Sequence, residues 1–431
     1  MDREILALAL PTFATLVSEP LLLLADSAII GHLGTTELAG LGIAASLLGI
    51  LTGLCVFLAY GTTGAVARRL GAGQPGAVLA GGVDGLILAA GLGLVLALAL
   101  QATLPLVVGA YGASAEVSAA ATSYLRVAAF SLPSILLLLA GTGVLRGLQD
   151  TRTPLYVAVV TNVANVGLNF AFVYGLDLGI AGSALGTLVA QTGAALYVAV
   201  LVVRGARREH VALRFRPRGV LAAARSGLWL VARTATLQAA VTVTTLVAAT
   251  GGTVVLASHQ ILGSLWILLA FALDAIAIAG QAIIGRALGA GNVALGRAMT
   301  RRMVGWGLLC GGVFGGLLFL ARPLYLGAFS PDPDVQSQVS RVLLVLALVS
   351  PVAGVVYVLD GVLIGAGDGR YLALAGLVAL LTYLPLALAV RAQDAGLGWL
   401  WAAYGGFMAA RMLTLLVRAR GDAWARVGAD I

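Results

Sequence analysis

The sequence predicts an all-α membrane protein whose twelve transmembrane helices form two parallel six-helix repeats. Composition is the first of three observations behind this prediction. Of the 431 residues, 60% are hydrophobic and 10% are charged, and the mean hydropathy is +1.02. A soluble domain of this size could not cover such a surface with polar groups, so the chain is expected to lie in a lipid bilayer. The other two observations are the lengths of the apolar runs and an internal repeat.

Each apolar run is long enough to span the hydrocarbon core of a bilayer, which takes about 20 residues of helix. Polar breaks separate twelve such runs, at roughly 5–33, 38–67, 77–105, 116–145, 154–175, 179–203, 220–249, 254–284, 297–322, 336–364, 371–391 and 395–418. Glycine and alanine often recur three or four residues apart, a pattern that lets helices pack closely in lipid. The runs are therefore predicted to be packed transmembrane helices.

The repeat appears when the chain is aligned with itself at an offset of 218 residues. Matching positions include Leu70–Gly73 with Leu288–Gly291, Pro133 with Pro351, Gly143 with Gly361, and Asp150 with Asp368. Each half holds six spans, an even number, so both halves enter the membrane from the same side and the repeats are parallel. We expect bundles over 1–203 and 220–431, joined by a basic cytoplasmic linker over 204–219.

Arginine placement gives the orientation in the membrane. Alternate connections are rich in arginine, above all the stretch 204–225, whereas the remaining connections hold few. Because arginine-rich loops stay in the cytoplasm, both termini are predicted to be cytoplasmic. These loops account for the formal charge of +8, which therefore does not indicate a nucleic acid partner. The stretch 204–225 either binds anionic lipid headgroups or is a solvated loop that enforces topology.

The first span carries two carboxylates, Glu19 and Asp26, and two prolines, Pro11 and Pro20. Glu19 and Asp26 are almost two helical turns apart and project from one face, while the prolines remove backbone donors and permit a bend. Burial disfavours the ionised form of a carboxyl group, so an acid here could hold a proton in one state and release it in another. The arrangement suits a proton-coupled gate. The alternative is that Asp26 packs helices together, bonded to Ser27 or to nearby backbone.

Further polar residues lie in neighbouring spans of the first half: Tyr124, Thr142, Asn165, Asn169 and Thr187. Asn165 and Asn169 are one helical turn apart and share a face. These residues either connect Asp26 to a proton-linked network or only hold helices together, which amides and hydroxyls often do in membranes.

The second half carries the intramembrane acids Asp274 and Asp360, with Gln281 among their polar neighbours. They form either a second cation site or structural bonds between helices. At the repeat offset Asp26 coincides with Thr244, so the halves are chemically unequal. No His, Cys or carboxylate cluster has the spacing of a zinc site, and no catalytic triad or phosphate-binding loop occurs. We expect no metal, no cofactor and no enzyme activity.

Several of these segments resemble one family of transporters. The segments 146–155, 25–34, 165–169, 274–289 and 360–368 are similar to motifs of the multidrug and toxic compound extrusion (MATE) family, in its DinF-like branch. The resemblance covers the whole chain. It implies a V-shaped pair of six-helix bundles around a central cavity, and the exchange of a drug-like, often cationic compound for protons or sodium ions.

The resemblance also implies roles for individual residues. Asp26 matches the first-helix acid of the family and Pro11 its bending proline. The matches to polar cavity positions are Glu19, Tyr124, Thr142, Asn165, Asn169 and Thr187. Some relatives carry a second acid where this chain has Asn169, and sodium-coupled members carry a seventh-helix acid in the region of Leu237 and Gln238. Protons are therefore expected as the coupling ion rather than sodium.

We thus expect a multi-pass antiporter of a bacterial inner membrane that exports small molecules, chiefly organic cations, by alternating access. Protonation of Asp26 would shift the first helix between straight and bent forms. The expected partners are the substrate and the lipid bilayer. A monomer is expected because the two halves already enclose a site.

Two other functions would fit a chain of this kind. A flippase for a lipid or a lipid-linked sugar needs a strongly cationic cavity for phosphate, whereas only Arg126 and Arg233 are found within or near the spans. A membrane enzyme acting on prenyl diphosphates needs close aspartate pairs that hold magnesium. Asp332 and Asp334 form such a pair, but they lie in a Ser-Pro-Asp-Pro-Asp turn on the outer side.

Overall fold

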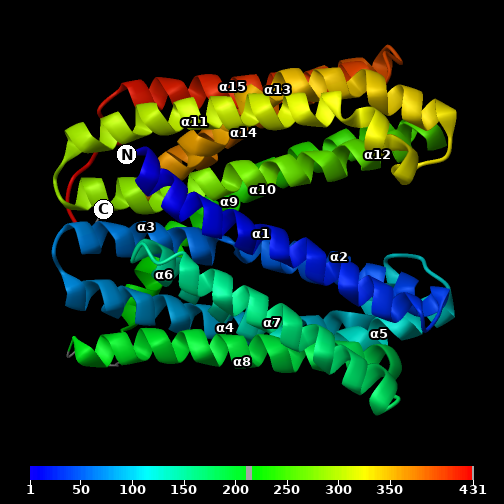
Figure 1. Ribbon diagram of the computed structural model, residues 1–431, viewed down its shortest axis with the longest axis horizontal. Coiled ribbons are helices and arrows are strands. Elements are labelled where there is room, and N and C mark those ends of the chain that lie inside the picture. The colour runs from blue at the N-terminus through cyan, green and yellow to red at the C-terminus, as the bar shows by residue number, and fades with distance from the viewer. Residues whose placement is uncertain (210–215, 430–431) are drawn as a thin grey trace. The chain divides into compact units, whose positions relative to one another are not determined.

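The computed structural model describes residues 1–209 and 216–429, which form helices joined by short turns (Figure 1). Twelve helical segments in these ranges are long and apolar enough to cross a membrane. No β-strand occurs in the described ranges. The predicted fold class, an all-α membrane protein with twelve spans, is confirmed.

Six spans lie in each half of the sequence. Those of the first half are built from α1 (Asp2–Gly31), α2 (Thr35–Cys55), α3 (Phe57–Gly71), α4 (Pro75–Gly109), α5 (Ala115–Ala128), η1 (Ala129–Ser131), α6 (Leu132–Gly147), α7 (Arg152–Phe170), η2 (Ala171–Gly175) and α8 (Gly179–Arg208). Three of these spans are compound: α2 continues into α3, α5 into α6 through the 3₁₀ turn η1, and α7 into the π-helical turn η2.

The second half has longer uninterrupted helices. They are α9 (Pro217–Thr250), α10 (Thr253–Gly289), α11 (Val293–Leu320), α13 (Pro333–Gly365), α14 (Gly369–Ala392) and α15 (Leu397–Arg420), with the short α12 (Arg322–Phe329) between two spans. The predicted linker 204–219 is helical at both ends, because α8 continues to Arg208 and α9 begins at Pro217. Residues 210–215 of that linker and residues 430–431 of the second bundle lie outside the described residues.

The chain divides into two compact units. The N-terminal unit is Ala14–Gly227, and the C-terminal unit is Met1–Phe13 together with the chain from Leu228 onward. The start of α1 belongs to the C-terminal unit because Asp2 accepts two hydrogen bonds from Arg302, at 2.6 and 2.5 Å, and one from the Trp306 indole, at 2.9 Å. These partners lie on α11, three hundred positions away in the sequence.

Packing within each unit repeats the same glycine contacts. In the N-terminal unit α6 lies against α3, and a Cβ atom on Gly143 would approach the carbonyl oxygen of Ala59 to 2.6 Å. In the C-terminal unit α13 lies against α10, and a Cβ atom on Gly361 would overlap the carbonyl oxygen of Ala277. Gly361 and Ala277 are each 218 residues beyond Gly143 and Ala59. The repeat inferred from the sequence is therefore also a repeat of helix–helix contacts.

A second contact follows the same rule. Gly93 of α4 lies against Pro133 of α6, and Gly311 of α11 lies against Pro351 of α13, each too close to hold a side chain. Helices come this near only where no Cβ intervenes, and in lipid such packing supplies much of the association energy. In Figure 1, α11, α13 and α15 accordingly run alongside one another within the C-terminal unit.

Helix ends repeat as well. After α3 and α10 the chain turns through Gly73 (φ 68°) and Gly291 (φ 75°), and each donates its N–H over 3.1 Å to a leucine carbonyl three residues earlier. After α6 and α13 the turns are made by Gln149 (φ 65°) and Gly367 (φ 76°), with equivalent bonds of 2.9 Å. Left-handed residues of this kind satisfy the last carbonyls of a helix.

Replacing Gly361 by alanine is expected to lower the free energy of unfolding by about 1–3 kcal/mol, because the new methyl group overlaps the backbone of α10. Gly316 of α11 is the matched control, since nothing lies within 4 Å of the position of its missing Cβ. Gly316→Ala should leave stability unchanged or raise it by up to about 1 kcal/mol. Unfolding of the purified variants in detergent measures both, and equal effects would contradict the packing described.

Candidate functional site

The acid of the first span, Asp26, is buried in α1 with 5% of its surface exposed. Its carboxylate accepts a hydrogen bond of 2.6 Å from the side-chain amide of Asn169 on α7. The bond joins residues 143 positions apart, both in the N-terminal unit. The charged end of Asp26 is therefore held by a neutral group from another helix.

This bond is the first link of a chain of polar side chains. The Asn169 amide also donates to the Asn165 side-chain oxygen over 3.0 Å, and the Asn165 amide donates to the Thr187 hydroxyl over 2.9 Å. Tyr124 of α5 shares a side-chain hydrogen bond with Thr187. The structure thus brings together five of the residues that the sequence singled out, contributed by α1, α5, α7 and α8.

The local fold of α7 places the two amides. Asn165 and Asn169 are four residues apart, so they lie on one face, and both are fully buried. Gly186 of α8 leaves room for the Asn169 side chain, whose oxygen would overlap a Cβ atom at that position. The helix then passes into the π-helical turn η2, a distortion that frequently accompanies functional sites.

The Asn169 amide is oriented to suit an ionised acid. A carboxylate only accepts hydrogen bonds, and the amide presents its N–H₂ to Asp26. The Asn169 side-chain oxygen is buried and has no hydrogen-bond partner among the described residues. Rotating the amide would turn this oxygen towards Asp26, where it could accept a hydrogen bond from the protonated acid. Asn169 can therefore serve both protonation states of its neighbour.

Four other predicted residues of the first half lie apart from this chain. Glu19 has an exposed side chain on α1, and no bond to the Asp26 network is seen within the described residues. Thr142 donates to the carbonyl of Leu139 in its own helix, over 3.1 Å. Pro11 and Pro20 are both contained in α1, which runs as one helix through them.

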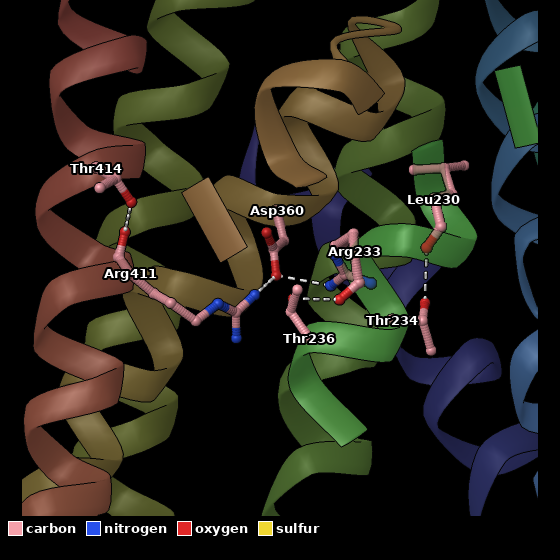
Figure 2. Close-up of polar contacts among 7 residues, drawn as sticks. All are labelled: Leu230, Arg233, Thr234, Thr236, Asp360, Arg411 and Thr414. Carbon is pink, nitrogen blue, oxygen red and sulfur yellow. Dashed lines mark hydrogen bonds and ion pairs between the residues drawn. The ribbon is translucent and has the colours of Figure 1, made fainter. Parts of the chain in front are cut away.

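In the C-terminal unit Asp360 of α13 is held by two arginines (Figure 2). Arg233 of α9 donates to the Asp360 oxygen Oδ2 over 2.7 Å, and Arg411 of α15 donates to the same oxygen. The three residues are 4%, 9% and 5% exposed, respectively. Of the two alternatives left open for Asp360, this geometry matches the bond between helices, since its carboxylate is already engaged by two cations.

Sequence reasoning missed Arg411. It named Arg126 and Arg233 as the arginines within or near spans, yet Arg411 lies inside α15 and is more deeply buried than Arg233. A signal was present, because an arginine flanked by apolar residues inside a membrane span needs a partner. The partner itself could not be identified, since it lies on another helix.

Asp274 and Gln281, both on α10, differ in their surroundings. Asp274 lies in electrostatic range of the Tyr357 hydroxyl, as do Arg233 and Arg411. Gln281 is 1% exposed and its backbone lies against Gly365 of α13. Asp274 thus acts electrostatically on the same hydroxyl as the two arginines, whereas the structure connects Gln281 to helix packing.

The repeat offset shows how the two units differ in charge. Asp26 and Asn165 correspond to Thr244 and Tyr383, whose hydroxyls form a neutral hydrogen bond of 2.6 Å within the C-terminal unit. Conversely, Asp360, Arg233 and Arg411 correspond to Thr142, Thr15 and Gly193. Each unit is thus charged where the other is neutral.

No group of three or more His, Cys, Asp or Glu side chains within residues 1–209 and 216–429 is arranged to hold a metal ion. The close pair Asp332 and Asp334 lies at the start of α13, where the Asp332 carboxylate accepts the backbone N–H of Asp334 over 2.9 Å. Asp332 is therefore a helix cap.

Asp360→Asn should lower the free energy of unfolding by about 3–5 kcal/mol, because it leaves two buried guanidinium groups without their anion. Asp332→Asn is the control, since asparagine caps a helix about as well as aspartate. Thermal unfolding in detergent compares the two. A loss at position 360 no larger than that at position 332 would show that the ion pair is not formed.

Comparison with known proteins places the chain in a family. Residues 11–171 and 232–389 match the MatE family model. The chain is 30% identical to Protein DETOXIFICATION 44, chloroplastic, of Arabidopsis thaliana over 433 residues, covering 96% of this chain and 81% of that protein. It is 31% identical to DNA damage-inducible protein F of Escherichia coli, covering 96% and 91%.

A solved structure gives the same answer for the fold. The bent form of the Vibrio cholerae MATE transporter VcmN aligns with a TM-score of 0.89 and 21% sequence identity, covering 98% of each chain. The family model spans well over half of this chain, and two relatives reach 30% identity along most of their length. The chain therefore belongs to the multidrug and toxic compound extrusion (MATE) family of membrane transporters.

Proposed function

We propose that this chain is a secondary active antiporter that exports drug-like organic cations in exchange for protons. The observation that carries the proposal is the surroundings of Asp26, a buried intramembrane carboxylate whose hydrogen-bond partner is a neutral amide. An acid that is not neutralised by a fixed cation can take up and release a proton as its surroundings change. Efflux of small molecules follows from the family.

A single proton supplies enough energy for useful export. Moving one charge across 100 mV releases about 2.3 kcal/mol. Since about 1.4 kcal/mol corresponds to a tenfold concentration ratio, this sustains a gradient of roughly fifty-fold. One titrating carboxyl group is therefore sufficient. Proton coupling does not require a second acid at the position of Asn169.

The proposed movement follows from the hydrogen bond itself. When Asp26 is ionised, the Asn169 amide donates to it and holds α1 against α7. When Asp26 is protonated, the Asn169 N–H₂ no longer faces an anion. The hydrogen bond between α7 and α1 then weakens, or the Asn169 amide rotates to accept the proton of the acid. Pro11 and Pro20 give α1 places to bend in response. Protonation thus biases α1 between straight and bent forms during alternating access.

We propose a monomer in a bacterial inner membrane with both termini in the cytoplasm, as arginine placement indicates. Proton transfer requires no cofactor, and sodium is not the coupling ion. Glu19 stays a candidate second acid on the same helix.

The flippase alternative has less support. It requires cationic groups available to a phosphate, whereas Arg233 and Arg411 both donate to Asp360 and Arg126 lies exposed on α5. A headgroup-accessibility assay on labelled lipids in reconstituted liposomes separates the two functions.

Asp26→Asn should abolish dye transport driven by a pH gradient in proteoliposomes, because the amide cannot exchange a proton. Asp177→Asn is the matched control, since this aspartate lies exposed in a turn at φ 53°, a conformation that asparagine tolerates. The rate of quenching of a cationic dye measures transport. Unchanged transport by the Asp26 variant would remove this residue from the coupling mechanism.

Asn169→Ala should slow the same transport roughly tenfold or more, because a hydrogen bond to a charged group contributes about 1.5–3 kcal/mol. Thr142→Ala should have little effect, since Thr142 bonds only within its own helix among the contacts seen here. Both variants remove one polar group from the same unit. Equal losses in the two variants would mean that the chain from Asp26 to Tyr124 has no special role.

A further inference from the structure

We propose that Arg233 and Arg411 are permanent counter-cations of Asp360, so that the C-terminal unit binds no coupling ion and ion exchange is confined to the N-terminal unit. The two arginines would then determine ion specificity for the whole transporter. This inference rests on the proposed antiport, and it extends that proposal to a site which the Asp26 mechanism does not use.

The geometry at Asp360 is that of an occupied cation site. Both guanidinium groups converge on the oxygen Oδ2, one from α9 and the other from α15 (Figure 2). An intramembrane carboxylate attracts whichever cation can reach it. Here the positive charge is covalently attached to neighbouring helices and directed by hydrogen bonds, so no diffusible ion is needed.

Arginine is well suited to a permanent role. Its guanidinium group remains protonated throughout the physiological range and its donors are fixed in one plane, unlike the single point charge of a lysine. A sodium ion or a proton at Asp360 would compete with two attached cations. Displacing either arginine would break a buried, charge-assisted hydrogen bond to Asp360, which is unfavourable. Asp360 therefore stays ionised and paired during the transport cycle.

Another acid lies in the same unit. Asp274, Arg233 and Arg411 all lie in electrostatic range of the partly buried Tyr357 hydroxyl, and Asp360 is bonded to the two arginines. Without the arginines, the Asp360 carboxylate would lack both attached counter-cations, which favours the uptake of a diffusible cation.

The contrast with the N-terminal unit makes the arrangement specific. At the equivalent positions that unit has Thr15, Thr142 and Gly193, none of which carries a charge. Its own acid, Asp26, has the neutral Asn169 as its hydrogen-bond partner. The duplicated fold therefore combines an acid that can exchange its proton, Asp26, with an acid whose counter-cations are covalently fixed, Asp360.

The test removes the attached charges and asks whether sodium replaces them. The double variant R233Q/R411Q keeps hydrogen-bond donors at both positions without their charge. Its thermal unfolding in detergent is measured at pH 8, with sodium chloride replaced by choline chloride at constant ionic strength. Sodium at about a hundred times its dissociation constant should raise the unfolding temperature of the double variant by about 3–6 °C.

The wild type and two further variants complete the design. The wild type and R233K/R411K, which retains both charges, should show no difference between sodium and choline. The triple variant R233Q/R411Q/D360N should also show none, because the carboxylate that the sodium ion would bind, that of Asp360, is gone. Sodium stabilisation of the wild type, or equal responses of the double and triple variants, would overturn the proposal.

A transport measurement on the wild type covers the case in which the double variant does not fold. Dye efflux from proteoliposomes is measured with a sodium gradient and no pH gradient, and no sodium-driven transport is expected. Sodium-driven transport would overturn the proposal. The two ideas fail separately. Proton-driven transport that persists in the Asp26→Asn variant would refute the proposed function, whereas sodium binding at Asp360 of the wild type would refute only the role of the arginines.

Discussion

The hydrogen bond between Asp26 and Asn169 is the interaction on which this account of the transporter depends. It places a carboxylate of the first helix inside the N-terminal unit and gives it a neutral partner. A fixed cation would have held Asp26 ionised, and an apolar partner would have held it protonated. An amide offers both a donor and an acceptor, so it is compatible with either state. The chain through Asn165 and Thr187 to Tyr124 then connects α1 with three other helices.

The internal repeat supplies a common frame on which the two units carry different chemistry. Gly143 and Gly361 bring equivalent helices into contact, so the backbones of the two halves are built alike. The charged groups occupy different places in this frame, however. Asp26 corresponds to Thr244, and Asp360 corresponds to Thr142. The duplicated scaffold thus carries a buried acid with a neutral partner in one half and a buried ion cluster in the other.

The sequence was sufficient for features that depend on local pattern. Span lengths followed from hydropathy, the repeat from glycine and proline spacing, and the pairing of Asn165 with Asn169 from helical periodicity. Features that depend on which helices meet were beyond it. The bond of Asp2 to Arg302 joins residues 300 positions apart and assigns the start of α1 to the C-terminal unit. Arg411 was overlooked because one arginine barely changes the mean hydropathy of its span. The sequence also could not show that the Thr142 hydroxyl bonds within its own helix rather than to the Asp26 network.

Proton release on substrate binding reports directly whether Asp26 is the coupling acid. Purified transporter in weakly buffered detergent solution is titrated with a cationic dye while a pH indicator records free protons. When the titration starts at a pH at which Asp26 is protonated, we expect about one proton to be released for each dye molecule bound, because cation binding and protonation of Asp26 oppose one another. The same titration of Asp26→Asn should release none. Binding of the dye without proton release, or equal release from the variant, would contradict the assignment of Asp26 as the coupling acid.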